Sequence, residues 1–205
     1  MKKLLIATHN LAKLEEIRKF LSDLPIDLVS LSDVGMSEDI EETGKTFEEN
    51  AILKAKYYSK RSGLPAIGDD AGIEIDALNG APGVKSKRWI GGVTTSDQEL
   101  IDYTFKQMNG VPSDKRGAQM RLVLAFADDG KIITTVEGIT RGIIPDKPSR
   151  LPIEKGFPFR QVLYIPEIHK YYNQDEMTEE EELKYNHRLK ALMKLKSYVQ
   201  NVTNR

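Results

Sequence analysis

Two adjacent aspartates, Asp69 and Asp70, are the residues of this sequence best suited to chemistry. They lie in the stretch Ile67–Ile73, between apolar residues typical of a buried strand. Burying two carboxylates is costly unless a cation or hydrogen-bond donors compensate them. A bound Mg²⁺ would do so, because it prefers oxygen ligands, and a carboxylate beside it can orient or deprotonate water for attack on phosphorus. We therefore expect a metal site here; an Asp-Asp turn at the surface is the alternative.

A second polar segment, Thr8–Lys13, joins an apolar run to a stretch with helical spacing. The free N–H groups and the positive dipole end of a first helical turn favour an anion, and Lys13 adds a charge that can reach it. The segment lacks the glycines of a P-loop or a dinucleotide fingerprint. It is thus a candidate phosphate site, unless Asn10 only caps the helix and Lys13 is solvated.

A third segment runs from Glu41-Glu42-Thr43-Gly44 into a helix that Thr46 is expected to cap. On this helix Asn50 and Lys54 fall beside the apolar stripe, not opposite it. Lys54 therefore either extends past the core to water or points into a cleft to meet a phosphate, and the pattern leaves both readings open.

The fourth segment, Lys184–Leu192, lies near the start of the last expected helix. His187 offers a donor for a base and Arg188 a fork for a phosphate. A solvated helical face is the commoner fate of such residues. The acidic run 179–182 is better explained as a favourable helix N-terminus than as a metal site.

The elements that must position these segments follow from hydrophobic period and capping patterns. The hairpin signal Asp128-Asp129-Gly130 is the strongest turn pattern. Thr178 and Glu181 form a capping box before one long closing helix lined by Leu192, Leu195 and Val199. The expected strands are 4–7, 64–76, 120–127, 131–137, 138–144 and 162–165, and the expected helices begin near residue 11, at Thr46, at Ser96 and at Thr178.

The composition bounds the function further. The chain has 205 residues, 40% of them hydrophobic, which suffices for one mixed α/β unit without separable domains. With 30 Lys+Arg against 31 Asp+Glu the formal net charge is -1, so no basic excess draws it to nucleic acid or a membrane. No cysteine is present, which excludes disulfides and thiolate chemistry and suits a cytoplasmic location. The opening apolar run is too short for a signal peptide.

In their order and spacing, these segments resemble the inosine triphosphate pyrophosphatase family, which removes noncanonical purine nucleotides such as dITP and XTP. The resemblance covers nearly the whole chain, and each motif alone is unspecific. Its motifs are Ala7-Thr8-x-Asn10-x-x-Lys13, Glu41-Glu42-Thr43-Gly44-x-Thr46-Phe47-x-Glu49-Asn50-Ala51-x-x-Lys54-Ala55, Asp69-Asp70-x-Gly72, Ala77-Leu78-x-Gly80-Ala81-Pro82-Gly83-Val84, Ser86-x-Arg88, Gly156-Phe157, Ile165-Pro166, Met177-Thr178-x-Glu180-Glu181 and His187-Arg188-x-x-Ala191-Leu192.

The resemblance implies a single domain over residues 1–205: an elongated, two-lobed α/β fold with a mixed sheet flanked by helices, a central substrate cleft and a homodimer. It also implies a site. Catalysis would fall to Asp70, supported by Asp69 and Lys54, with Mg²⁺ as cofactor held by Glu41 and Asp70. The substrate would be bound by Thr8, Asn10, Lys13, Lys54, Phe157, His187 and Arg188, with Phe157 stacking on the base.

The sequence departs from the family pattern on the side that recognises the base. Ala71 replaces the usual Ser, Asn186 replaces the Ser before the His, Arg160 replaces an Asp and Glu182 replaces a Lys. The last two changes reverse charge, so we hypothesise that Arg160 and Glu182 pair with each other or that one of them reads a different base. Drift in a pocket under relaxed selection would also explain them.

Two functions follow as expectations. The first is Mg²⁺-dependent hydrolysis of noncanonical purine nucleoside triphosphates to a nucleoside monophosphate and pyrophosphate, in a cytoplasmic enzyme with an altered base pocket. The alternative is a nucleotide-binding protein of the same fold with little or no turnover. The intact Asp69-Asp70 pair and Glu41 favour the enzyme, because a pure binder has no need of clustered carboxylates opposite a polyanion.

Overall fold

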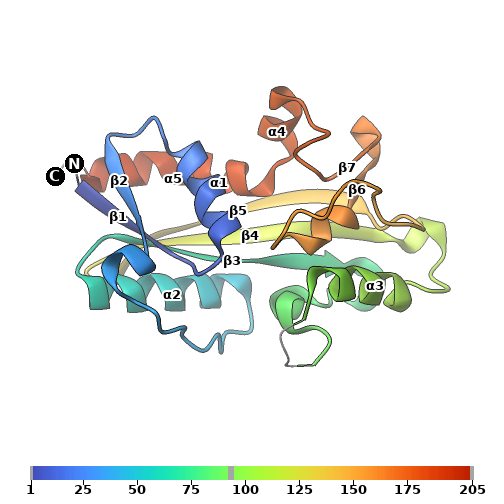
Figure 1. Ribbon diagram of the computed structural model, residues 1–205, viewed down its shortest axis with the longest axis horizontal. Helices are drawn as coiled ribbons and strands as arrows, with labels where there is room; N and C mark the ends of the chain where they lie inside the picture. The colour runs from blue at the N-terminus through green and yellow to red at the C-terminus, as the bar shows by residue number, and fades with distance from the viewer. Residues whose placement is uncertain (1, 92–94, 204–205) are drawn as a thin grey trace. The chain divides into compact units, whose positions relative to one another are not determined.

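The strands and helices seen in the structure, a computed structural model, make an α/β fold (Figure 1). The structure describes residues 2–91 and 95–203, with side chains as far as residue 201. The strands are β1 (Lys2–Ala7), β2 (Ile26–Ser30), β3 (Ala66–Ile75), β4 (Gly117–Asp128), β5 (Lys131–Ile143), β6 (Tyr164–Ile165) and β7 (Lys170–Tyr171). The helices are α1 (Leu11–Phe20), α2 (Phe47–Ser62), α3 (Asp97–Gln107), α4 (Glu179–Tyr185) and α5 (His187–Thr203).

Within these described ranges the strands form a seven-stranded sheet in the order β2-β1-β3-β4-β5-β6-β7. The sheet is mixed: β1 runs parallel to β2 and β3, whereas β6 runs antiparallel to β5 and β7. The expected α/β class with a mixed sheet is thereby confirmed.

The parallel pairing of β1 with β3 prepares the candidate site. Ala7 pairs with Gly68, so the loop that begins at Thr8 leaves the sheet beside Asp69. The carboxyl ends of neighbouring parallel strands meet at one edge of a sheet, where such folds place their ligands. The loop that begins at Thr8 and the Asp69-Asp70 segment, which are distant in the sequence, therefore lie side by side.

The structure confirms the predicted hairpin turn but not every predicted strand. Asp129 and Gly130 both have positive φ, 46° and 70°, as the expected two-residue hairpin turn between β4 and β5 requires. The extended piece expected at 138–144 is not a separate strand, because β5 continues through Gly138 without a turn. The sequence pattern does not predict β2, a five-residue edge strand whose middle is partly exposed.

Helices α1, α2 and α3 begin where their caps predict, at Asn10, Thr46 and Ser96. The single closing helix is a wrong prediction. The capping box at Thr178 starts the short α4, and the chain then breaks at Asn186, whose φ of -73° and ψ of 110° are extended. A new helix, α5, begins at His187. No helix within the described ranges is long and apolar enough to cross a membrane.

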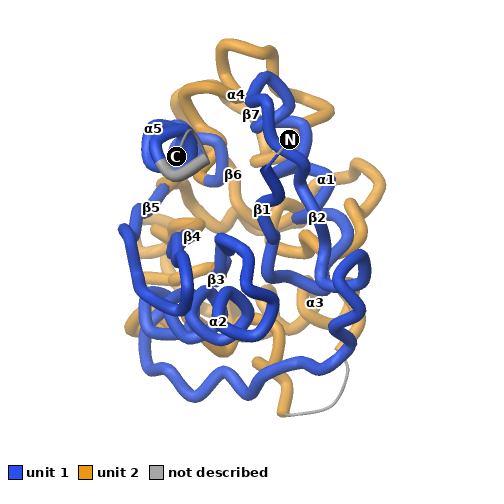
Figure 2. Tube along the Cα trace, turned by 90° about the vertical axis from the view of Figure 1, so that its left-hand side faces the viewer, with its two compact units in different colours: residues 1–70, 122–138, 188–205 blue, residues 71–121, 139–187 orange. Residues whose placement is uncertain are grey.

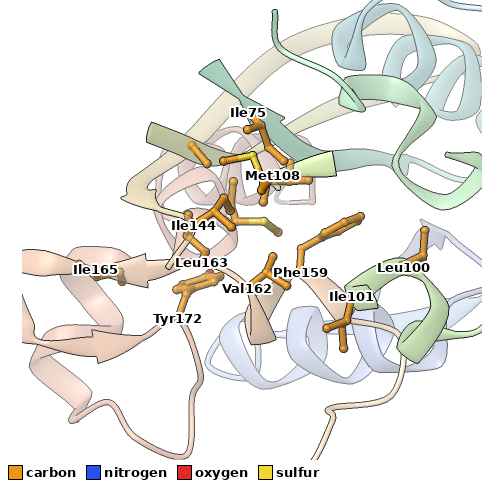
Figure 3. Packing of buried hydrophobic residues seen from close by; sticks show 13 residues of the cluster. Ile75, Leu100, Ile101, Met108, Ile144, Phe159, Val162, Leu163, Ile165 and Tyr172 are labelled. Carbon is orange, nitrogen blue, oxygen red and sulfur yellow. The ribbon is translucent and has the colours of Figure 1, made fainter. Parts of the chain in front are cut away.

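The chain divides into two compact units, coloured in Figure 2. Unit 1 comprises 1–70, 122–138 and 188–205, and unit 2 comprises 71–121 and 139–187. Each unit has its own apolar cluster. The cluster of unit 1 contains Leu5, Ala7, Val29, Leu31, Tyr58 and Ala66. The cluster of unit 2, shown in Figure 3, includes Ile75, Leu100, Met108, Ile144, Phe159, Leu163 and Tyr172.

Within unit 1, α2 lies on one face of the strands, and α1 and α5 lie on the other (Figures 1 and 2). The approach of α2 is close: a Cβ atom on Gly68 would lie only 2.2 Å from the carbonyl oxygen of Ala51. Glycine at this position therefore lets the helix pack directly on β3. As a result, side chains from α1, α2 and α5 all reach Asp69 and Asp70 in the middle of β3.

Candidate functional site

The centre of the site is the middle of β3, where Asp69 and Asp70 point to opposite faces. Successive side chains of a strand alternate between the two faces of a sheet. Asp69 contacts residues of α1 and α5, whereas Asp70 contacts residues of α2. Both aspartates are buried, with exposed fractions of 1% and 7%. The pair is thus not a surface turn, and its members have different surroundings.

Asp69 is compensated by two cations. One carboxylate oxygen accepts a hydrogen bond from Nζ of Lys13, and the other accepts one from the guanidinium of Arg188. Arg188 also donates through Nε to Glu16 on α1, at 2.7 Å. Arg188 is itself 1% exposed, so this ion pair chain lies inside the unit. Burial alone would raise the pKa of Asp69, but Arg188 and Lys13 hold it well below its usual range, so the carboxylate is ionised.

The partners described for Asp70 include an amide and an ammonium group. Asn50 donates from Nδ2 to one oxygen of Asp70 at 2.9 Å, and Nζ of Lys54 lies 3.9 Å from the other. Asn50 in turn accepts the backbone N–H of Gly44 at 2.8 Å, which fixes its amide. A Cβ atom on Gly44 would lie 2.5 Å from the Oδ1 atom of Asn50, so glycine is needed for this approach.

Lys54 points into the site. Its ammonium donates to the backbone carbonyl of Asp69 at 2.7 Å and forms an ion pair with Glu42. Of the two alternatives for Lys54, extension to water or entry into the site, the structure therefore supports the second. Burial alone would lower the pKa of Lys54, but Asp70 and Glu42 raise it, so the side chain is protonated.

The pKa of Asp70 is shifted in the direction opposite to that of Asp69. Burial is the largest cause and raises it; Lys54 lowers it and the carboxylate of Glu42 raises it, with a result of about 6. Two neighbouring carboxyl groups with opposite shifts are an arrangement typical of functional sites. Asp69 serves as a fixed negative charge, and Asp70 remains close to its titration range.

The loop before α2 contributes Glu42 to this cluster rather than Glu41. Glu41, expected to be a metal ligand, is exposed, and its carboxylate makes no ion pair with any residue that the structure describes. The backbone of 41–45 alternates between exposed and half-buried residues, so only one of two adjacent glutamates can face the site. Alternation in an extended chain predicts that only one of Glu41 and Glu42 faces the site, but the sequence does not tell which one.

The expected phosphate segment has a defined local structure. Asn10 caps α1 by accepting the N–H groups of Ala12 and Lys13, at 3.0 and 3.2 Å, and Thr8 accepts the N–H of Asn10 at 3.1 Å. The side-chain oxygen of Asn10 is thus engaged in the helix cap. Of the residues expected in unit 1, the structure brings together Lys13, Lys54, Asp69, Asp70 and Arg188. It adds Glu16, Glu42 and Asn50.

The two other expected residues, Phe157 and His187, lie in unit 2 within an aromatic and cationic cluster. The guanidinium of Arg160 lies over the ring of Phe157, 4.0 Å from its centre, and 5.6 Å from the ring centre of Tyr172. The hydroxyl of Tyr172 lies 2.6 Å from Nδ1 of His187. The sequence analysis missed Tyr172, because a single tyrosine between short strands carries no pattern.

The charge-reversed residues have described partners of their own. Arg160 donates to both carboxylate oxygens of Glu154, each at 2.7 Å. Glu182 accepts a hydrogen bond from Nδ2 of Asn186 at 2.9 Å. Glu154 was therefore a missed partner of Arg160, and the hypothesis of an Arg160–Glu182 pair stays a prediction.

The carboxylates of unit 1 fit a divalent cation of the kind that retains water. In the described part of the chain no three Asp, Glu, His or Cys side chains gather into a metal-binding group. Glu42 and Asp70, however, both flank the ammonium of Lys54, so two carboxylates already face one positive charge. Mg²⁺ typically takes one or two carboxylates and fills its other positions with water and phosphate oxygens.

Fold and site together define an α/β protein with a buried cluster of carboxylates and cations on β3, beside the carboxyl end of the parallel strand β1. A family model described as the Ham1 family matches residues 4–198. The chain belongs to the Ham1 family.

Similar proteins agree with this assignment over nearly their full lengths. The chain is 40% identical over 200 residues to a dITP/XTP pyrophosphatase of Thermoanaerobacter pseudethanolicus, covering 96% of each chain. It is 38% identical to the dITP/XTP pyrophosphatase of Bacillus subtilis, covering 95% of this chain and 96% of that protein. A solved structure of a HAM1 protein from Coxiella burnetii matches with a TM-score of 0.83 and 32% identity, over 98% of this chain and 100% of the other. The resemblance inferred from the motifs is thereby confirmed.

Replacing Arg188 by Met is expected to destabilise the fold strongly. The change leaves the carboxylates of Asp69 and Glu16 buried without their shared cation, which costs about 3–5 kcal/mol in comparable sites. The matched control is Arg18→Met, which removes an ion pair with Asp33 in which both side chains are roughly half exposed. That change should cost less than about 1 kcal/mol. Urea unfolding measures both values, and equal losses would contradict the buried network.

The raised pKa of Asp70 predicts a stability that falls as pH rises in metal-free buffer. Between its ordinary value of 3.8 and about 6, the folded state binds the proton more tightly than the unfolded state. The linkage relation then gives a negative slope, worth up to about 3 kcal/mol by pH 7 for a shift of this size. Unfolding of wild type and Asp70→Asn from pH 4 to 7, with chelator present, isolates this slope. Parallel curves for the two proteins would refute the shift.

Proposed function

We propose that this chain hydrolyses noncanonical purine nucleoside triphosphates to the nucleoside monophosphate and pyrophosphate. The observation that carries the proposal is the arrangement around Asp70: a buried carboxylate beside the ammonium of Lys54 and the carboxylate of Glu42. A purely structural ion pair between Lys54 and Asp70 does not require the second carboxylate of Glu42. A site that binds a polyanion together with a divalent cation requires both carboxylates. The names of the relatives supply the same activity and the dITP and XTP substrates.

The cations of unit 1 would bind the triphosphate. Lys13, Lys54 and Arg188 present two ammonium groups and one guanidinium around Asp69 and Asp70 of β3. The N–H groups at the start of α1 add the positive end of a helix dipole beside Lys13. Phosphate oxygens would join the carboxylates of Asp69 and Glu42 as partners of these cations, so binding needs no new cation.

Asp70 would orient the attacking water. Its carboxylate is held by Asn50, which is itself held by Gly44, so the oxygen that faces Lys54 has a fixed direction. The water oxygen bonds to the α phosphorus, the bond from that phosphorus to the bridging oxygen of the β phosphate breaks, and pyrophosphate leaves with the electron pair. Asp70 accepts a proton from the water and passes it to solvent. Lys54 stabilises the charge that develops on the phosphates.

The proposed cofactor is Mg²⁺, held by Asp70 and Glu42. When bound, the ion would neutralise phosphate charge and lower the barrier to departure of pyrophosphate. The assignment moves the second ligand from Glu41 to Glu42, since Glu42 is the glutamate that contacts Lys54. Asp69 would be a supporting residue, because its two oxygens hold Lys13 and Arg188 in place.

The base would be bound in unit 2 by Phe157 and His187, which Arg160 and Tyr172 contact. The proposal treats residues 1–205 as one functional domain and the enzyme as a cytoplasmic homodimer, as the family resemblance implies. The alternative function, nucleotide binding with little turnover, shares every binding residue and differs only in the use of Asp70.

A substrate panel separates the enzyme from the pure binder. With Mg²⁺ present, the wild type should release pyrophosphate from dITP and XTP faster than from the four standard deoxynucleoside triphosphates. Asp70→Asn should reduce this release by about 100-fold or more, the scale of a lost acid–base group. Pyrophosphate is measured by a coupled phosphate assay. Equal release by wild type and variant would point to a contaminating enzyme and reject the assignment of Asp70.

The adjacent glutamates provide a matched test of the metal ligand. Glu42→Gln should lower kcat and raise the Mg²⁺ concentration needed for half-maximal activity by about tenfold, since one of two charged ligands is lost. Glu41→Gln changes the same charge one residue away, on an exposed side chain. It should leave both quantities close to wild type. The reverse ranking would restore Glu41 as the ligand.

A further inference from the structure

Two successive turns of unit 2 place Glu154, Phe157 and Arg160 three residues apart. The N–H of Phe157 donates to the carbonyl of Glu154 at 3.0 Å, and the N–H of Arg160 donates to the carbonyl of Phe157 at 3.1 Å. Gly156, with a φ of 87°, lies in the first turn, and Arg160 lies in the 3-10 helix Pro158–Gln161. The local backbone thus brings a carboxylate, an aromatic ring and a guanidinium close to one another.

The side-chain contacts follow this spacing. The guanidinium of Arg160 covers one face of the Phe157 ring at 4.0 Å, and its NH1 atom is held by both oxygens of Glu154 at 2.7 Å. Arg160 is 1% exposed and Phe157 is 9% exposed, whereas the side chain of Glu154 is 34% exposed. The carboxylate therefore lies toward the surface, and the cation lies inward against the ring.

This arrangement is an expensive way to fill a core. Burying a guanidinium costs free energy that its carboxylate partner often only balances, so a hydrocarbon side chain would serve stability as well. What the ion pair provides is geometry: a cation fixed by two hydrogen bonds holds the plane of the ring that it covers. A base can then stack only on the opposite face of Phe157.

We propose that Arg160, locked by Glu154, is a positioning residue that holds the ring of Phe157 in place to receive the purine base. The inference rests on the proposed function, in which Phe157 stacks on the base. It assigns a role to the position where the family pattern has an acidic residue. Arg160 acts through Phe157, so its loss weakens recognition of the base and leaves the handling of the triphosphate unchanged.

The test compares substrates that differ only in the base. For dITP, Arg160→Met should raise KM by about tenfold, the scale of a lost base–aromatic stack, with little change in kcat. For the abasic 1,2-dideoxyribose 5-triphosphate, KM and kcat should match wild type. Glu154→Gln, at a more exposed site and so safe for folding, should shift KM for dITP in the same direction by less. Arg150→Met, an exposed arginine of the same segment, is the matched control and should change nothing.

Two outcomes would overturn the inference. An equal loss on dITP and on the abasic substrate would mean that Arg160 only supports the fold, and an unchanged KM for dITP in both variants would mean that Phe157 does not depend on it. Calorimetric binding of dIMP against 1,2-dideoxyribose 5-phosphate gives the same comparison without turnover. Failure of the proposed function would instead appear as a wild type that releases no pyrophosphate, while the difference in binding between dIMP and the abasic phosphate persists.

Discussion

The charge of Asp69 is the constraint on which the organisation of unit 1 depends. A carboxylate that is 1% exposed must keep its cations, because an unpaired charge at this depth would cost several kcal/mol. Lys13 and Arg188 meet that requirement from α1 and α5, and Glu16 balances the second charge of the arrangement. One buried anion thereby fixes two helices against the middle of β3, and the same cations are those proposed to bind the triphosphate.

Strand alternation separates the two aspartates into different roles. Asp69 faces α1 and α5 and is held ionised, whereas Asp70 faces α2 and has a pKa raised to about 6. The two pKa values differ because the aspartates have different neighbours: Arg188 and Lys13 lower the pKa of Asp69, whereas burial and Glu42 raise that of Asp70 against the effect of Lys54. The close packing of α2, permitted by Gly68, brings Asn50 and Lys54 to Asp70. The close approach of α2 at Gly68 therefore also sets the surroundings of Asp70.

The departures from the family pattern acquire a physical meaning in unit 2. Arg160 reverses a charge, yet its guanidinium pairs with Glu154 and lies 4.0 Å from the ring centre of Phe157, so its charge is compensated locally. Glu182 has Asn186 as a hydrogen-bond partner, at the break between α4 and α5. Each altered residue thus has a partner close to it in the sequence.

The sequence by itself determined the elements whose signals are local. Caps placed the starts of α1, α2 and α3, the Asp129-Gly130 turn placed a hairpin, and the motif order identified the family, because each of these depends on residues within a few positions of one another. Only the tertiary structure decided that Glu42 and not Glu41 faces Lys54, that Glu154 holds Arg160, and that the last helix breaks at Asn186. The phase of an extended loop and the partner of a buried charge are set by what packs against them, and a linear pattern does not contain that information.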